Sequence, residues 1–264
     1  MTRDERRTIG FDRPVHLAWL DAMAGRLATG ASAKEARREL WTLLDGVVSG
    51  KTLQSARGKT LTVLSRIWLT VPSGVGPMRD NALLLVGEAT AEDRLAIHWA
   101  LMSAAYPFFV DLASNVGKLI ALNGDFSLSQ LTRRLVEIWG DRSTLRPAAQ
   151  RVVRSMIGWG VLREGARPGQ YLPAPKRIVV SAPAAELLIE GLLVGAGRGM
   201  ALGQILTHPA TFPFELRLDS TRLRKSERLR LHRQGDQTDF VERKEMRPSS
   251  PTGASTSDRI RTAR

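Results

Sequence analysis

The chain has 264 residues and no cysteine, so it is long enough to bury a hydrophobic core without covalent staples. The absence of cysteine excludes disulfides, zinc ribbons, iron–sulfur clusters and thiol nucleophiles. With 39 Lys plus Arg against 26 Asp plus Glu, the formal net charge is +13. This excess of positive charge favours a polyanionic partner.

No targeting or membrane-spanning segment is predicted. The first 14 residues carry charges of both signs and no apolar run follows them, which argues against a secretion signal or a transit peptide. The longest uncharged stretch, residues 95–110, contains His98 and Pro107 and is shorter than the roughly 20 apolar residues that cross a bilayer. We therefore expect a cytoplasmic protein with no membrane partner.

Helical periodicity dominates the first half of the chain. Apolar residues return every three or four positions in several windows, and Ser32 followed by Glu35 has the spacing of a capping box. The loop at residues 72–77 is rich in Pro and Gly and interrupts the pattern, and Gly124 supplies a left-handed helix stop. We predict a helical N-terminal domain over residues 1–124.

The pattern changes from Asp125 onward. An extended residue, Phe126, precedes a helix that ends near Trp139, and a short turn leads to a second helix over residues 145–157. Two short apolar runs on either side of a Gly/Pro-rich loop then predict a β-hairpin ending near residue 173. This order of elements over residues 125–175 is that of a winged helix.

The remainder of the chain is predicted to be smaller and mixed. Residues 176–245 combine a helix near residues 183–194 with short apolar runs and a turn around Gly235, which indicates a mixed α/β region. Residues 246–264 have almost no apolar side chains and are expected to form a disordered basic tail. The predicted fold class is mainly α, with a helical N-terminal bundle, a central winged helix-turn-helix and a small α+β C-terminal region.

The second helix of the predicted pair carries a basic face. No Asp or Glu occurs between Ser143 and Arg163, and the polar residues of the helix lie away from its apolar stripe. Arg and Gln can contact guanine and adenine in the major groove, while neighbouring Arg side chains neutralise phosphates. A solvated basic surface without a ligand is the alternative. The predicted DNA-binding residues are Arg133, Arg134, Arg142, Arg146, Gln150, Arg151, Arg154, Arg163 and Arg167.

Two resemblances support this interpretation. The run STLRPAAQRVVRSMIGWGVL leading into REGARPGQYLP resembles a winged helix-turn-helix, which implies a helix in the major groove and a wing along the adjacent backbone. Pro147 fits this resemblance only if it lies in the first helical turn. The wider layout, with RDNALLLVGEATAEDRLAIHWALMSAAYPFF before this motif, is similar to the small BrxA-type subunits of BREX phage-resistance systems. That similarity implies a non-catalytic DNA binder with an antiviral role.

A second basic concentration lies between Arg217 and Arg233 and has two interpretations. It can make phosphate contacts that do not depend on sequence, or it can serve solubility alone. The four histidines lack the spacing of a metal site, and no complete phosphate-loop motif occurs.

We therefore predict no enzymatic activity, no metal and no cofactor. The predicted partners are double-stranded DNA and the other protein subunits of a larger complex, such as a phage-defence system. The alternatives are a protein-interaction scaffold, an RNA-binding protein and a winged-helix transcription regulator.

Overall fold

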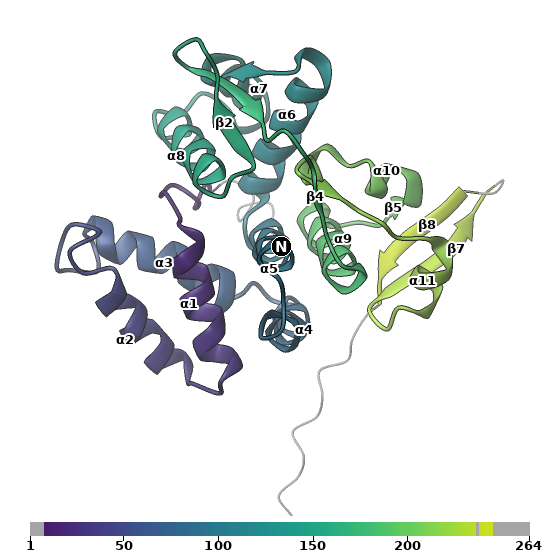
Figure 1. The fold of residues 1–264 in the computed structure, drawn as a ribbon, viewed down its shortest axis with the longest axis horizontal. Helices are drawn as coiled ribbons and strands as arrows, with labels where there is room; N and C mark the ends of the chain where they lie inside the picture. The colour runs from purple at the N-terminus through teal and green to yellow at the C-terminus, as the bar shows by residue number, and fades with distance from the viewer. Residues whose placement is uncertain (1–7, 236–237, 245–264) are drawn as a thin grey trace, which may run out of the picture.

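The computed structural model describes residues 8–235 and 238–244, and the chain it describes is mainly helical (Figure 1). The predicted tail at residues 246–264 lies outside the described residues. The larger helices, in chain order, are α1 (Leu17–Ala28), α2 (Ala33–Leu43), α3 (Ala56–Trp68), α4 (Gly76–Val86), α5 (Ala91–Ala105), α6 (Pro107–Asn123), α7 (Leu128–Trp139), α8 (Leu145–Gly158) and α9 (Ala182–Ala196).

Local signals set several helix ends, and two of them, the Ser32–Glu35 capping box and the Gly124 stop, were predicted. Ser32 and Glu35 form a reciprocal capping box at the start of α2. Ser127 and Gln130 form a second box at the start of α7, in which the Ser127 amide donates to the Gln130 side chain at 2.7 Å. Gly124 ends α6 with a φ of 78°, in the left-handed region where a Cβ is unfavourable. Helix α4 was not predicted, because its start follows a Pro/Gly-rich loop.

Helices α5 and α9 form the centre of the molecule. Every residue of α5 from Leu95 to Ala105 is buried, and α9 buries most of its length against it. The two backbones come close at Gly191, where an added Cβ would lie 2.4 Å from the carbonyl oxygen of Ala100. Figure 1 shows helices α1–α3 on one side of this pair and the C-terminal strands on the other.

One apolar core runs through the regions that were predicted as separate domains. Trp99 of α5 is fully buried and packs edge-to-face against Phe109 and Phe214, and its Nε1 donates to the carbonyl oxygen of Ala210 at 3.1 Å. The same core cluster includes Leu131 of α7. The domain boundaries near residues 124 and 175 remain predictions, but the apolar core is continuous across both.

The strands form three small sheets. Residues Phe126–Ser127 (β1), Leu162–Glu164 (β2) and Gln170–Pro173 (β3) form an antiparallel sheet in the order β1-β3-β2. Strands β4 (Ile178–Val179) and β6 (Phe214–Glu215) pair in parallel. The third sheet has the order β5-β8-β7, built from Met200–Ala201, Thr238–Arg243 and Leu229–Gln234. The short helices α10 (Leu202–Leu206), η2 (Pro209–Thr211) and α11 (Ser220–Lys225) complete the C-terminal region.

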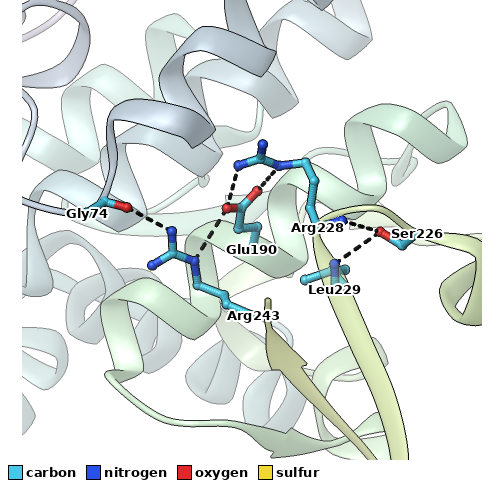
Figure 2. Close-up of polar contacts among 6 residues, drawn as sticks. All are labelled: Gly74, Glu190, Ser226, Arg228, Leu229 and Arg243. Carbon is cyan, nitrogen blue, oxygen red and sulfur yellow. Dashed lines mark hydrogen bonds and ion pairs between the residues drawn. The ribbon is translucent and has the colours of Figure 1, made fainter. Parts of the chain in front are cut away.

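A buried carboxylate attaches the third sheet to α9 (Figure 2). Glu190, with 3% of its side chain exposed, accepts two hydrogen bonds of 2.6 Å from Arg228. Arg243 donates to the same carboxylate at 3.4 Å and to the carbonyl oxygen of Gly74 at 2.8 Å. The buried carboxylate of Glu190 therefore joins α9 to Arg228 before β7 and to Arg243 of β8, and Arg243 extends the link to the loop before α4.

Among the described residues, no single helix has the length and apolar composition of a membrane span. The pair α5 and α6 meets both criteria only when taken together, and the two helices bend by 119° at their junction.

Candidate nucleic-acid interface

Helices α7 and α8 follow one another across a short turn, and the antiparallel strands β2 and β3 come next in the chain. Helix α7 buries Leu131 and Leu135, and α8 buries an apolar stripe that includes Val152 and Met156. The turn between them is short, and the Leu145 amide donates to the Arg142 carbonyl oxygen at 3.0 Å. Strands β2 and β3 follow α8 directly, and β1, which precedes α7, pairs with β3. Figure 1 shows α8 at the periphery of the molecule beside β2.

The start of α8 decides which side chains face outward. The N-cap residue is Thr144, which makes no side-chain capping bond. Pro147 is then the third residue of the helix, within the first turn, where its missing N–H has no intrahelical partner to lose. Pro147 therefore does not interrupt α8, and the polar residues of the helix stay off its apolar stripe.

Three of the predicted residues form one outward row on α8. Arg146 and Arg154 are exposed and Gln150 is half-buried. They are four residues apart, so they rise about 6 Å per step along one face, or about 12 Å in total. Within residues 8–235 and 238–244, none of these three side chains makes a hydrogen bond or an ion pair. The row presents two guanidinium groups and one amide to solvent.

Arg151 does not belong to this row, which corrects the predicted site. It lies 100° around the helix from Gln150, is half-buried, and donates from its guanidinium group to the carbonyl oxygen of Asp12 at 3.0 Å. The periodicity of α8 placed Arg151 off the apolar stripe correctly. It did not reveal that the N-terminal segment covers that side of the helix.

The N-terminal segment is bound to α8 at two further points. The amide of Val15 donates to Ser155 Oγ at 2.9 Å, and Trp159 Nε1 donates to the carbonyl oxygen of Val15 at 2.9 Å. Val15, Ser155 and Trp159 are all buried. These contacts link residues about 140 positions apart and fix the inner side of α8 against the helical core.

The other predicted arginines lie on α7, in the turn before α8 and on the hairpin after it. Arg133 is exposed and Arg134 half-buried on α7, and Arg142 is exposed in the turn. Arg163 is exposed on β2, and Arg167 is exposed in the hairpin loop. Across residues 125–173 the chain has eight arginines and four carboxylates, and the latter are Asp125, Glu137, Asp141 and Glu164. The surface is therefore basic but is interrupted by acids outside α8.

Gln170 fixes the shape of the hairpin loop, a role that no sequence signal indicated. Its side-chain oxygen accepts from the Arg167 amide at 3.3 Å, and its side-chain nitrogen donates to the Asp125 carboxylate. The Gly165 amide donates to the Gln170 carbonyl oxygen at 2.8 Å. Because this loop is held at both ends, Arg167 projects from a defined backbone.

One carboxyl group that contacts the end of α7 has a shifted pKa. Burial raises the pKa of Asp111 on α6, although Trp139 Nε1 donates to its carboxylate at 3.0 Å and lowers it in part. This contact joins α6 to the end of α7. Farther away, burial lowers the pKa of His98, whose ring nitrogens contact Trp68 Nε1 at 3.2 Å and Asp21 at 3.0 Å.

No group of three His, Asp or Glu side chains that can hold a metal ion occurs in the part of the chain that the structure describes. The comparisons with family models, with curated proteins and with solved structures find no match for this chain. What the surface around α8 can do is therefore inferred from its own side chains.

Proposed function

We propose that the protein binds double-stranded DNA through a winged helix, with α8 in the major groove and the β2–β3 hairpin as the wing. The order β1, α7, α8, β2, β3 and the sheet order β1-β3-β2 support this assignment. Attraction of phosphates by the surrounding arginines supplies most of the affinity, and α8 contacts the base edges.

The observation that carries the proposal is the outward row on α8. Arg146, Gln150 and Arg154 extend over about 12 Å, which corresponds to roughly three to four base pairs at 3.4 Å each. Arg makes paired hydrogen bonds to guanine, and Gln makes them to adenine. A row that serves only solubility needs no glutamine and no rigid support from Val15 and Trp159 on the opposite side.

The remaining arginines act as phosphate contacts in this proposal. Arg163 and Arg167 on the hairpin contact the backbone beside the groove, and Arg133, Arg134 and Arg142 contact it on the other side of α8. Such contacts orient the protein without reading sequence. Arg151 is a positioning residue, because it holds Asp12 rather than DNA.

We further propose that the protein acts without catalysis, as an accessory subunit of a bacterial phage-defence system that brings a larger effector to DNA. This part rests on the similarity in layout to BrxA-type subunits. A winged-helix transcription regulator would use the same surface, and the genes beside this one would separate the two.

The experiment is a binding titration of the full chain with a fluorescent DNA duplex between 50 and 200 mM salt. The test variant is Arg146→Gln/Arg154→Gln, which removes two exposed charges from α8. Each lost base contact costs about 1–3 kcal/mol, so we expect the Kd to rise by roughly 30-fold or more. The matched control is Lys34→Gln/Arg38→Gln on α2, which removes the same two charges from an exposed helix elsewhere.

The control variant should bind within about threefold of the original chain, because it changes only the long-range attraction. If both variants lost the same amount of affinity for the duplex, positive charge anywhere on the protein would serve equally well. The proposal that α8 is the interface would then be wrong. Tighter binding of an RNA duplex, or no binding of any duplex, would favour the RNA-binding or protein-interaction alternatives respectively.

A further inference from the structure

A cavity of about 500 Å³ lies where the C-terminal sheet meets the helical core. Four segments form its walls: the loop before α4, the end of α5, the end of α9 with the residues that follow it, and β8. Its apolar wall consists of Pro72, Val75, Ala104, Leu193 and Val194. The volume falls within the range of roughly 300–1,000 Å³ for small-molecule sites, which are mostly apolar and carry a few polar groups.

Arg243 brings a guanidinium group to this cavity in a fixed orientation. Its Nε donates to Glu190 at 3.4 Å, and its Nη2 donates to the carbonyl oxygen of Gly74 at 2.8 Å. Figure 2 shows the third nitrogen of the group without a bond to either of these partners. Two nitrogens therefore hold the group in place, and one remains to donate to a ligand.

Positive charge exceeds negative charge around Glu190. Arg228 donates to both oxygens of this carboxylate at 2.6 Å, whereas the contact from Arg243 is longer, at 3.4 Å. In the described part of the chain, neither arginine forms an ion pair with any other carboxylate. Two guanidinium groups thus share one negative charge. One positive charge remains unbalanced at the wall of the cavity, where reduced contact with water strengthens its attraction for an anion.

Arg198 adds a second unbalanced charge. The register of β5 and β8 pairs Met200 with Val241, and continuing it by two positions places Arg198 opposite Arg243. Both arginines line the cavity. Arg198 is exposed, and within residues 8–235 and 238–244 it makes no hydrogen bond or ion pair. Because like charges in opposite positions of an antiparallel pair are destabilising, an anion bound between these two side chains would stabilise the sheet.

Glu242 is the acidic residue of the lining, and it does not neutralise this pair. It precedes Arg243 in β8, and consecutive residues of a strand point to opposite faces of the sheet. It lies instead against Gly199, where an added Cβ would be 2.6 Å from Glu242 Cγ. Among the described residues it forms no ion pair with Arg198 or Arg243.

These side chains define the chemistry of the ligand. Two unbalanced guanidinium groups favour a dianion with several acceptor oxygens, such as a phosphate, over a carboxylate with a single charge. The hydroxyl of Ser73, which also lines the cavity, can donate a further hydrogen bond. The apolar wall requires that the phosphate carry a non-polar organic group, because inorganic phosphate would leave that wall in contact with water.

We propose that this cavity binds a phosphate monoester, with the phosphate between Arg198 and Arg243 and the organic group against Val75 and Leu193. The ligand then contacts β8, α9 and the loop before α4 together. Its binding therefore strengthens the attachment of the C-terminal sheet to the helical core. The site goes beyond the proposed DNA interface, with which it shares no residue.

The test is an NMR titration of the full chain at about pH 7.5, where a phosphate monoester is largely a dianion. The amide signals of Gly74 and Gly199, beside the cavity, are followed. Phenyl phosphate combines both features of the ligand, inorganic phosphate supplies the dianion alone, and benzoate supplies an apolar ring with one charge. We expect phenyl phosphate to bind roughly tenfold more tightly than either of the other probes, because each of them lacks one set of contacts.

The test variant is Arg198→Gln, which should weaken the binding of phenyl phosphate by roughly tenfold or more, the worth of one hydrogen bond between charged groups. Arg198 is exposed, so this substitution leaves the fold intact. The matched control is Arg224→Gln on α11. Arg224 is also exposed, makes no hydrogen bond or ion pair in the described chain and does not line the cavity. The control should bind every probe as the original chain does.

Three results would overturn the proposal: no shift of the Gly74 and Gly199 signals with phenyl phosphate, equal binding of phenyl phosphate and benzoate, or equal losses in Arg198→Gln and Arg224→Gln. Inorganic phosphate that bound as tightly as phenyl phosphate would likewise contradict the role of the apolar wall. Arg146→Gln/Arg154→Gln should bind the probes normally, so failure of the DNA proposal is distinguishable from failure of this one.

Discussion

Glu190→Gln tests how the C-terminal sheet is attached to the core. In the native chain the Glu190 side chain is 3% exposed and faces two guanidinium groups, those of Arg228 and Arg243, whose side chains are 13% and 30% exposed. The substitution removes the negative charge but keeps the shape. Arg228 then remains largely buried with a neutral amide in place of its counter-ion, and its charge is no longer balanced.

Removing one partner of a buried ion pair typically costs about 3–5 kcal/mol. We expect the lower end, about 3 kcal/mol, because the Gln oxygen still accepts one hydrogen bond and Arg243 can turn toward solvent. For a chain of this size each kcal/mol corresponds to roughly 2–4 °C, so the Tm should fall by about 6–12 °C. Denaturant unfolding followed by circular dichroism measures the free energy directly.

The matched control is Glu215→Gln, which removes one charge from the pair of Arg217 and Glu215, 66% and 42% exposed respectively. An exposed pair contributes less than about 1 kcal/mol, so this variant should unfold nearly as the original chain does. The double variant Glu190→Leu/Arg228→Met should recover most of the loss, because apolar side chains of similar size often replace a buried pair without cost. If Glu190→Gln were no less stable than Glu215→Gln, the inference that burial makes this pair essential would be refuted.

Three further predictions concern the core. Gly191→Ala should destabilise the fold by about 1–3 kcal/mol or more, since its Cβ would lie 2.4 Å from the Ala100 carbonyl oxygen, and urea unfolding measures this. Ser155→Ala should lower the free energy of unfolding by about 1–3 kcal/mol, because it leaves the buried amide of Val15 without an acceptor. Hydrogen exchange that is faster at the Val15 amide than at other core amides would show that the destabilisation is local. Burial holds the pKa of His98 below 6.5, so the unfolded chain gains a proton first as the pH falls, and stability should drop below about pH 6.5 by up to ~1.4 kcal/mol per pH unit. Urea unfolding between pH 5 and 7.5 checks this, and a flat profile contradicts it.

Local chemistry was sufficient to predict much of the helical half and the shape of the candidate interface. Ser32 and Ser127 each cap a helix with a residue three positions later, and Gly124 stops α6 through its own backbone conformation. These interactions span one helical turn, so the order of residues specifies them. The 3.6-residue repeat likewise places Arg146 and Arg154 on the outward side of α8.

Contacts between residues far apart in the chain were decided only by the tertiary structure. The carbonyl oxygen of Asp12 engages Arg151 across 139 positions, and Glu190 engages Arg228 across 38. Nothing in the periodicity of α8 or α9 marks these partners, because periodicity records which side of a helix is apolar and not which segment lies against it. The parallel pairing of β4 with β6 and the cavity beside Arg243 have the same origin, since each arises where separate segments meet.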